Sequence, residues 1–336
     1  MFSDTDLDSF RQRFTQGLAR MLDDDALGAF ILVLANSMQD EPLHAALMPA
    51  LRTRFTTLMA AFDAGRLQGA PDDVAVFEAL AKRGIEAFGT WEMRCAGPWQ
   101  LAFNPLRALR PPRGAGDKFT SIRQPFDPDR FHFDKPFLRP EIMAEVDFDG
   151  TPLRIMYHKF PFAPYHLMLL PKASAHLPQV IDDATHRLLW RISEAAGRTL
   201  PGFGLACNTL GGGASINHLH AHAFVDTTPL PIERPQWAHN GGASDYPLHC
   251  RRLSSVEESA DAIDELNHRN QPFNLFYRPG HCYLLPRRPQ GDDRVPSWLR
   301  SAAWFEVCGG FNLFDRDRFD SLDATEIEQG LRTLRV

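Results

Sequence analysis

Three histidines, His218, His220 and His222, alternate along one segment directly behind a glycine-rich turn. Successive side chains of a β-strand point to opposite faces, so this spacing predicts three imidazoles on one face of a strand. The preceding residues 208–215, NTLGGGAS, include three consecutive glycines, which let main-chain N–H groups come close to an anion. Because an imidazole can attack phosphorus, the pattern indicates chemistry on a phosphate ester or anhydride.

Three interpretations of this strand compete. Histidines buried only for packing would be costly, because each imidazole needs hydrogen-bond partners. A metal-dependent enzyme is a second interpretation, since two histidines separated by one residue are a common ligand pair. Phosphoryl or nucleotidyl transfer is the third, and the glycine-rich turn favours it, because a metal site needs no phosphate cradle beside it.

The overall composition bounds the partners of the protein. The 336 residues are 44% hydrophobic and 23% charged, which is typical of a soluble globular chain. A net charge of −6 argues against broad electrostatic binding to nucleic acid or to an anionic membrane. We therefore expect no nucleic-acid partner and no membrane partner, and any phosphate recognition must be local.

The cysteines and the N-terminus bear on the compartment. The five cysteines are scattered and form no C-x-x-C pair, which argues against a disulfide framework and against a thiolate zinc site. The first residues are acidic and lack the apolar core of a signal peptide, and no apolar run reaches membrane-spanning length. These features predict a cytoplasmic protein that requires no metal or other cofactor.

The N-terminal quarter of the chain has the pattern of helices. Apolar residues recur at spacings of three and four in residues 7–22, 51–62 and 74–85, so each stretch presents one apolar stripe. We therefore expect an N-terminal helical region over residues 1–94. The stretch 110–116, RPPRGAG, has the composition of a linker.

Beyond the linker the pattern changes to short strands. Residues 153–157 and 166–170 are apolar candidates for strands, and residues 183–200 have the pattern of a helix that ends before Pro201-Gly202. Residues 165–172 are also weakly similar to residues 280–287. In both segments an apolar strand starts near a histidine and ends at a proline followed by a basic residue, which we call the internal echo.

The echo predicts a duplicated fold whose second half has degenerated. Residues 304–311 fall roughly where a second histidine strand would stand, and they carry no histidine. We expect a catalytic half over residues 95–230 and a degenerate half over 231–336. A chance match between two apolar strands is the alternative.

Several motifs together carry a resemblance to a known family. The stretch 218–224, HLHAHAF, resembles the signature of the histidine-triad superfamily, and residues 165–172, with His176 beyond, resemble its first strand and turn. The stretches QPFD at 124–127 and NHLH at 217–220 are similar to the GDP-hexose phosphorylases. That group stands with galactose-1-phosphate uridylyltransferase and diadenosine tetraphosphate phosphorylase. The resemblance covers about residues 95 to 336.

The resemblance implies an α+β fold with an antiparallel sheet of the histidine-triad type, and a covalent mechanism. His220 would attack the α-phosphorus of a nucleotide sugar and release a sugar phosphate, leaving a nucleotidyl-histidine for inorganic phosphate or water to attack. His218 would orient the site. His222 would bind a phosphate oxygen or serve the leaving group.

The neighbouring polar residues would bind the substrate. Main-chain N–H groups of the glycine-rich turn would contact its oxyanions, and side chains would position the phosphate or the catalytic strand. The candidates are Asn208, Gly211, Gly213, Ser215, Asn217, Lys135, Lys159 and His166. Asn217 points to the opposite face if the strand is already regular there.

One departure from the related transferases leaves the final acceptor open. Many of those enzymes carry glutamine at the third position of the triad, whereas this chain carries His222, as many nucleotidyl hydrolases do. We predict a nucleotidyltransferase that acts as a phosphorylase on a nucleoside diphosphate hexose, GDP-linked by the resemblance. A hydrolase, an enzyme for dinucleoside polyphosphates and a binding protein without catalysis are the alternatives, and a homodimer is an open possibility.

Overall fold

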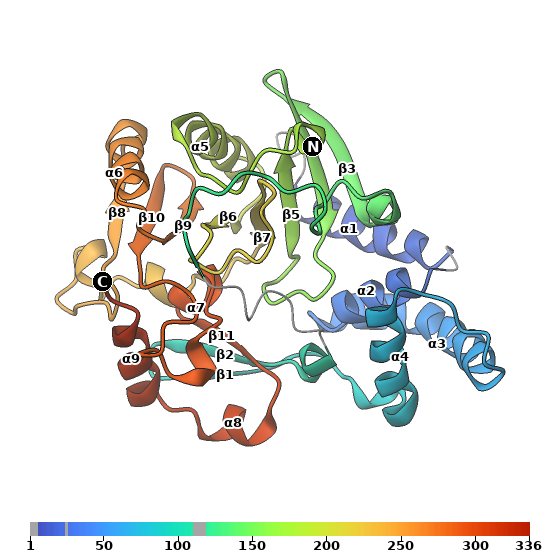
Figure 1. Cartoon of the computed structure of the whole chain (residues 1–336). Coiled ribbons are helices and arrows are strands. Elements are labelled where there is room, and N and C mark those ends of the chain that lie inside the picture. Colours follow the sequence, from blue (N-terminus) through green and yellow to red (C-terminus); the bar gives the residue numbers. More distant parts are fainter. Residues whose placement is uncertain (1–5, 24–25, 110–118) are drawn as a thin grey trace.

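The computed structural model describes residues 6–23, 26–109 and 119–336, and Figure 1 shows their arrangement. A helical region lies to one side of a large antiparallel sheet, and a smaller sheet and the C-terminal helices lie below it (Figure 1). The α+β class is therefore confirmed. The linker predicted at 110–116 lies outside the described residues.

Four N-terminal helices form the first region. Three of them, α1, α3 and α4, coincide with the predicted apolar stripes. The helix α2 was not predicted, because ten of its eleven residues are buried and a helix that is apolar all round has no stripe. The helices are α1 (Leu7–Met21), α2 (Leu27–Ser37), α3 (Glu41–Asp63) and α4 (Pro71–Arg83).

Aromatic contacts join α1 to the main sheet. Phe14 is buried on the apolar face of α1, and its ring meets the ring of Tyr157 edge-on at 5.0 Å. The Tyr157 hydroxyl donates a hydrogen bond to the Phe14 carbonyl at 3.0 Å. The helical region is therefore packed against the sheet that carries the histidines.

The main sheet has eight strands in the order β3-β4-β5-β7-β6-β9-β10-β8, and every neighbouring pair is antiparallel. The helices α5 (Asp183–Gly197) and α6 (Val256–His268) contact each other, and α5 packs on β6 and β9. The strands are β3 (Ile142–Phe148), β4 (Thr151–Tyr157), β5 (Leu167–Pro171), β6 (Phe203–Asn208), β7 (Ala221–Val225), β8 (Arg251–Leu253), β9 (Phe273–Arg278) and β10 (His281–Pro286).

The two echoing segments occupy β5 and β10 of this one sheet. The second half of the chain adds β8, β9, β10 and α6, and β9 pairs directly with β6 of the first half. Residues 304–311, expected near a second histidine strand, instead form α7 (Trp304–Val307) and the start of β11 (Gly310–Leu313). This segment leaves the main sheet because β11 pairs in parallel with β2.

The smaller sheet joins the segment that follows the N-terminal helices to the C-terminal part of the chain. It contains β1 (Glu92–Ala96), β2 (Trp99–Phe103) and β11, and the helices α8 (Arg316–Ser321) and α9 (Ala324–Thr333) follow β11. Within the described ranges, none of the helices has the length and apolarity needed to cross a membrane. The short 3₁₀ turns are η1 (Ile85–Ala87), η2 (Pro105–Leu109), η3 (Pro136–Glu141), η4 (Ala173–Ala175), η5 (Pro231–Glu233), η6 (Ala238–Asn240) and η7 (Ser297–Leu299).

Candidate active site

A cavity of about 1020 Å³ opens at the histidine segment. Its wall combines the N-terminal helices, the η3 turn, the glycine-rich loop and the C-terminal segment around α7 and β11. A volume of this size suits a nucleotide-sized ligand. The predicted site residues in its lining are His220, His222, Asn208, Gly213, Ser215 and Lys159.

His220 has one ring nitrogen committed to the main chain. Its Nδ1 lies 2.7 Å from the carbonyl oxygen of His218, so Nδ1 carries the proton and donates. The lone pair is therefore on Nε2. The side chain is only 5% exposed, and burial lowers the pKa of His220 to about 4. A neutral imidazole with a defined basic nitrogen consequently lines the cavity at neutral pH.

The backbone of His220 is held by Gln179, which the sequence did not single out. Gln179 Oε1 accepts from the His220 N–H at 2.8 Å, and Gln179 Nε2 donates to the His220 carbonyl at 3.0 Å. The same amide nitrogen donates to the Asn208 carbonyl at 2.9 Å. Gln179 is fully buried, and its side chain satisfies the hydrogen-bonding groups of the main chain where the β6–β7 pairing ends and the glycine-rich loop begins.

His218 lies outside the cavity lining, which corrects the expectation of three imidazoles on one strand face. Only His222 lies within β7, because the strand begins at Ala221. His218 Nε2 donates to the Ala173 carbonyl at 2.9 Å, and His218 Nδ1 accepts from the Phe133 N–H at 3.1 Å. Both ring nitrogens are used, so His218 supports the fold around the site and presents its carbonyl to His220.

His222 has a side-chain partner at each ring nitrogen. Its Nδ1 lies 2.9 Å from His166 Nε2, and its Nε2 lies 3.4 Å from Asn208 Nδ2. His166 Nδ1 accepts from the Phe162 N–H at 3.4 Å. His166 is fully buried behind His222 and outside the cavity lining, and burial lowers its pKa well below the usual value.

Asn208 places a donor beside His222. Its Oδ1 accepts from Asn274 Nδ2 at 2.7 Å and from the Trp304 N–H at 2.8 Å, so the Nδ2 group must point the other way. This Nδ2 lies 3.4 Å from His222 Nε2. Asn208 therefore brings an N–H donor to the cavity wall, where an anionic oxygen can accept from it.

The glycine-rich loop is shaped by packing as well as by the cavity. Gly211 and Gly213 have φ values of 75° and 107°, a region that favours glycine. A side chain on Gly213 would meet the main chain of Ala303, and one on Gly211 would meet the Phe119 ring. Gly213 and the exposed Ser215 line the cavity, whereas Gly211 does not.

Asn217 connects two of the sequence motifs. Its Nδ2 donates to the carbonyls of Gln124 and Pro125 at 3.2 and 2.7 Å, and its Oδ1 accepts from the Gln179 N–H at 2.9 Å. Asn217 is outside the cavity lining. The motif 124–127 is thus held against the histidine segment, where Phe126 stacks on His176 with ring centroids 4.9 Å apart.

The two predicted lysines are placed differently. Lys159 lines the cavity, and its Nζ pairs with Asp73 of α4 at 2.6 Å. Lys135 lies outside the lining, where its Nζ donates to the Pro128 carbonyl at 3.2 Å. The cavity also contains Arg107, a cation that the sequence did not distinguish because it stands between the helical region and the linker without a motif.

The histidines His158, His166 and His222 bring ring nitrogens within 4.8 Å of one another. A metal ion lies close to the plane of each imidazole that binds it, because the lone pair lies in that plane. The rings of His158 and His166 are parallel to within 6° with centroids 4.1 Å apart, so their planes do not meet at one ion. This cluster does not fit a shared metal ion as arranged, and the absence of a required metal stays a prediction.

Comparison with known proteins finds similarity to nucleotide phosphorylases over part of the chain. Residues 100–224 match the family described as the GDPGP1-like N-terminal domain. Human GDP-D-glucose phosphorylase 1 is 34% identical over 134 residues, which is 37% of this chain and 33% of that protein. Arabidopsis thaliana GDP-L-galactose phosphorylase 2 is 27% identical over 203 residues, or 49% of this chain and 46% of that protein.

A solved structure supports the fold over a longer stretch. The yeast Ap4A phosphorylase in complex with Ap4A has a TM-score of 0.52 at 15% identity, over 78% of this chain and 96% of that chain. The chain spans less than half the length of the curated relatives just named. The predicted resemblance to the GDP-hexose phosphorylases and the histidine-triad fold are confirmed.

Proposed function

We propose that this relative of the GDP-hexose phosphorylases cleaves a nucleoside diphosphate hexose with inorganic phosphate through a nucleotidyl group on His220. The observation that carries the proposal is the tautomer of His220 in the cavity. His220 holds its proton on Nδ1 and its lone pair on Nε2. This ring is thus a nucleophile, and the Asn208 amide beside His222 is a hydrogen-bond donor.

In the first step the lone pair on His220 Nε2 attacks the α-phosphorus. A nitrogen–phosphorus bond forms, and the bond from that phosphorus to the oxygen of the sugar phosphate breaks. The ring becomes positively charged and keeps its Nδ1 proton, which donates to the His218 carbonyl at 2.7 Å. That carbonyl stabilises the charged ring in a buried site.

Asn208 can donate its Nδ2–H to the negative charge that develops on the reacting phosphoryl group. Hydrogen bonds from Asn274 Nδ2 and the Trp304 N–H to Asn208 Oδ1 fix the orientation of this amide. Such a donor costs no reorganisation when charge builds on a phosphoryl or leaving-group oxygen. In the second step an oxygen of inorganic phosphate attacks the same phosphorus, the nitrogen–phosphorus bond breaks, and a nucleoside diphosphate leaves.

The relatives support the identity of the substrate. Proteins named GDP-D-glucose phosphorylase and GDP-L-galactose phosphorylase match this chain, so a GDP-hexose is the substrate we propose, in a cytoplasmic setting. The second candidate is a nucleotidyl hydrolase, which His222 at the third triad position favours. Water would then attack the intermediate and release a nucleoside monophosphate.

The experiment is a panel of nucleotide sugars incubated with the enzyme, with and without phosphate, followed by separation of the products. We expect nucleoside diphosphate and hexose 1-phosphate only when phosphate is present. Nucleoside monophosphate whose yield is unchanged by phosphate would instead support the hydrolase. His220→Ala should abolish turnover and the nucleotidyl mass increment, and residual activity in that variant would contradict the covalent step.

A further inference from the structure

Arg287 is the basic residue that ends the second segment of the internal echo, and it is fully buried. It directly follows β10, and its main-chain N–H donates to the Pro272 carbonyl at 2.9 Å. Lys172, the basic residue that ends the first segment, is exposed. The two equivalent positions therefore differ, because the second half of the chain turns its cation into the interior.

Main-chain carbonyls hold the Arg287 guanidinium. Its Nη1 donates to the Ala302 carbonyl at 2.5 Å, and its Nε donates to the Arg288 carbonyl at 3.1 Å. Its Nη2 is shielded from water and has no hydrogen-bond partner within the part of the chain that the structure describes. A buried cation held by neutral carbonyls costs free energy, so stability alone does not account for its place.

The Ala302 carbonyl begins a turn that lies against the glycine-rich loop. Ala302 lines the cavity, and a side chain on Gly213 would meet the Ala302 carbonyl oxygen at 2.9 Å. Two residues further along, the Trp304 N–H donates to Asn208 Oδ1 at 2.8 Å. The main chain of residues 302–304 is thus bound by Arg287 at one end and bound to Asn208 at the other.

The orientation of the Asn208 amide depends on this turn. Asn208 Oδ1 accepts from the Trp304 N–H and from Asn274 Nδ2, the latter at 2.7 Å. These two donors leave Asn208 Nδ2 on the side of His222, 3.4 Å from its Nε2. The two ends of an amide have nearly the same shape, and only their partners distinguish them. A displaced Trp304 N–H would therefore weaken the preference for the orientation that presents Nδ2 to the cavity.

We propose that Arg287 is a positioning residue for nucleotidyl transfer. By fixing the Ala302 carbonyl it holds the Trp304 N–H on Asn208, and so keeps Asn208 Nδ2–H directed at the reacting phosphoryl group. The inference rests on the proposed function. Arg287 is outside the cavity lining, so its loss should lower the rate constant and leave the affinity for the substrate nearly unchanged.

The kinetic test is a double-mutant cycle with Asn208, measured by single-turnover nucleotidylation with GDP-glucose. We expect Arg287→Met to lower the rate constant about tenfold and to change KM less than about twofold. In the Asn208→Ala background the same substitution should lower the rate less than about twofold, because the donor that it orients is already gone. Arg287→Lys keeps the charge and one donor, so it should recover part of the loss.

The matched control is Arg94→Met. Arg94 also donates to main-chain carbonyls, those of Phe319 and Leu322, but it is outside the cavity lining. This variant should keep the wild-type rate constant and KM. Hydrogen exchange of the Trp304 amide in the resting enzyme tests the anchor without activity. It should be faster in Arg287→Met and unchanged in Arg94→Met.

A tenfold loss that persists in the Asn208→Ala background would overturn the inference, and so would unchanged exchange at Trp304 in Arg287→Met. If Arg287→Met does not fold, Arg287→Lys takes its place in the cycle. A wild-type rate for Arg287→Lys together with wild-type exchange at Trp304 would then support the anchor, and a loss that does not depend on Asn208 would contradict it. A wild-type enzyme that forms no nucleoside diphosphate would instead contradict the proposed function, while the exchange comparison would still decide whether Arg287 holds the turn.

Discussion

At the scale of single residues, the hydrogen-bond partner of His220 decides which of its ring nitrogens is basic. His220 Nδ1 lies 2.7 Å from the carbonyl oxygen of His218. A carbonyl can only accept, so it forces a proton onto Nδ1 of His220 and leaves the lone pair on Nε2.

The pKa of His220 predicts how nucleotidylation depends on pH. Burial lowers this pKa from 6.5 to about 4, so the neutral, nucleophilic form prevails above that value. The rate of nucleotidylation should be independent of His220 ionisation from pH 8 down to about 5, and should fall to about half at pH 4. Single-turnover quenching across pH 4–8, with circular dichroism to verify folding, measures it. A midpoint near 6.5 would contradict the assignment.

Asn208→Asp tests the donor beside His222. The substitution keeps the shape of the side chain but replaces the Nδ2–H donor with a carboxylate oxygen beside His222. We expect kcat to fall about 10²-fold, the usual effect of losing one preorganised donor, with a smaller change in KM. Steady-state kinetics and a thermal melt would separate this effect from unfolding. An unchanged kcat would remove Asn208 from the transition state.

At the scale of elements, the cavity depends on helices that are far from the histidines in sequence. Side-chain contacts hold these helices against the sheet. Lys159 follows β4, and its ion pair with Asp73 joins that loop to α4. Both side chains are largely buried, at 21% and 14% exposure. Tyr157 makes a comparable connection from β4 to α1. Rotation of the helices away from the sheet would open one wall of the cavity.

The Lys159–Asp73 pair should stabilise this arrangement. Lys159→Met or Asp73→Asn leaves the other charge partly buried without its partner, so we expect each to lower the free energy of unfolding by about 1–3 kcal/mol. The double variant should lose less than the sum of the two. Urea unfolding of the four proteins measures the coupling. Additive losses would indicate that the ion pair carries no net stabilisation.

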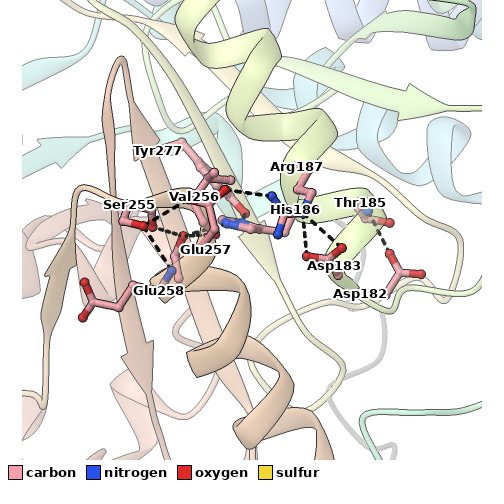
Figure 2. A network of polar contacts seen from close by, with 11 residues as sticks. Asp182, Asp183, Thr185, His186, Arg187, Ser255, Val256, Glu257, Glu258 and Tyr277 are labelled. Atoms are coloured by element: carbon pink, nitrogen blue, oxygen red, sulfur yellow. Dashed lines mark hydrogen bonds and ion pairs between the residues drawn. The ribbon is translucent and has the colours of Figure 1, made fainter.

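At the scale of the whole molecule, a buried polar network joins the two halves of the chain (Figure 2). His186 of α5 contacts the Tyr277 hydroxyl of β9 through Nδ1 at 2.9 Å and Ser259 Oγ of α6 through Nε2 at 2.7 Å. The Ser259 hydroxyl donates to the Ser255 carbonyl at 2.8 Å, so His186 Nε2 is the donor to Ser259. Arg187 adds an ion pair to Glu257 at the rim (Figure 2).

This network predicts acid sensitivity of the fold. Burial lowers the pKa of His186 to about 4, so between pH 6.5 and 4 the unfolded chain binds more protons and stability falls as pH falls. The contribution of His186 amounts to at most about 3 kcal/mol over that window. His218 has the same sign and adds to the loss. His186→Gln should reduce the pH slope of the unfolding free energy, and an unchanged slope would contradict this origin.

Periodicity explains why much of the fold was predictable. Stripes at spacings of three and four predicted α1, α3 and α4, and short apolar runs predicted β4 and β5, because these patterns report which side of an element meets the core. The helix α2 was not predicted, because it is apolar on all sides and so has no stripe. The strand β11 was not predicted, because its partner β2 is distant in sequence. Pairing between remote segments leaves no local pattern.

The sequence by itself determined which chemistry to expect: alternating histidines behind a glycine-rich loop predict a phosphorus electrophile, and the family resemblance implies His220 as the nucleophile. Only the tertiary structure decided how the histidines divide their roles. In the structure His218 lies outside the cavity lining and His166 lies behind His222. Gln179 holds the backbone of His220, and Arg107 lines the same cavity. Tautomer and charge depend on which donors and acceptors surround a ring in space, and those come from segments that no local spacing connects.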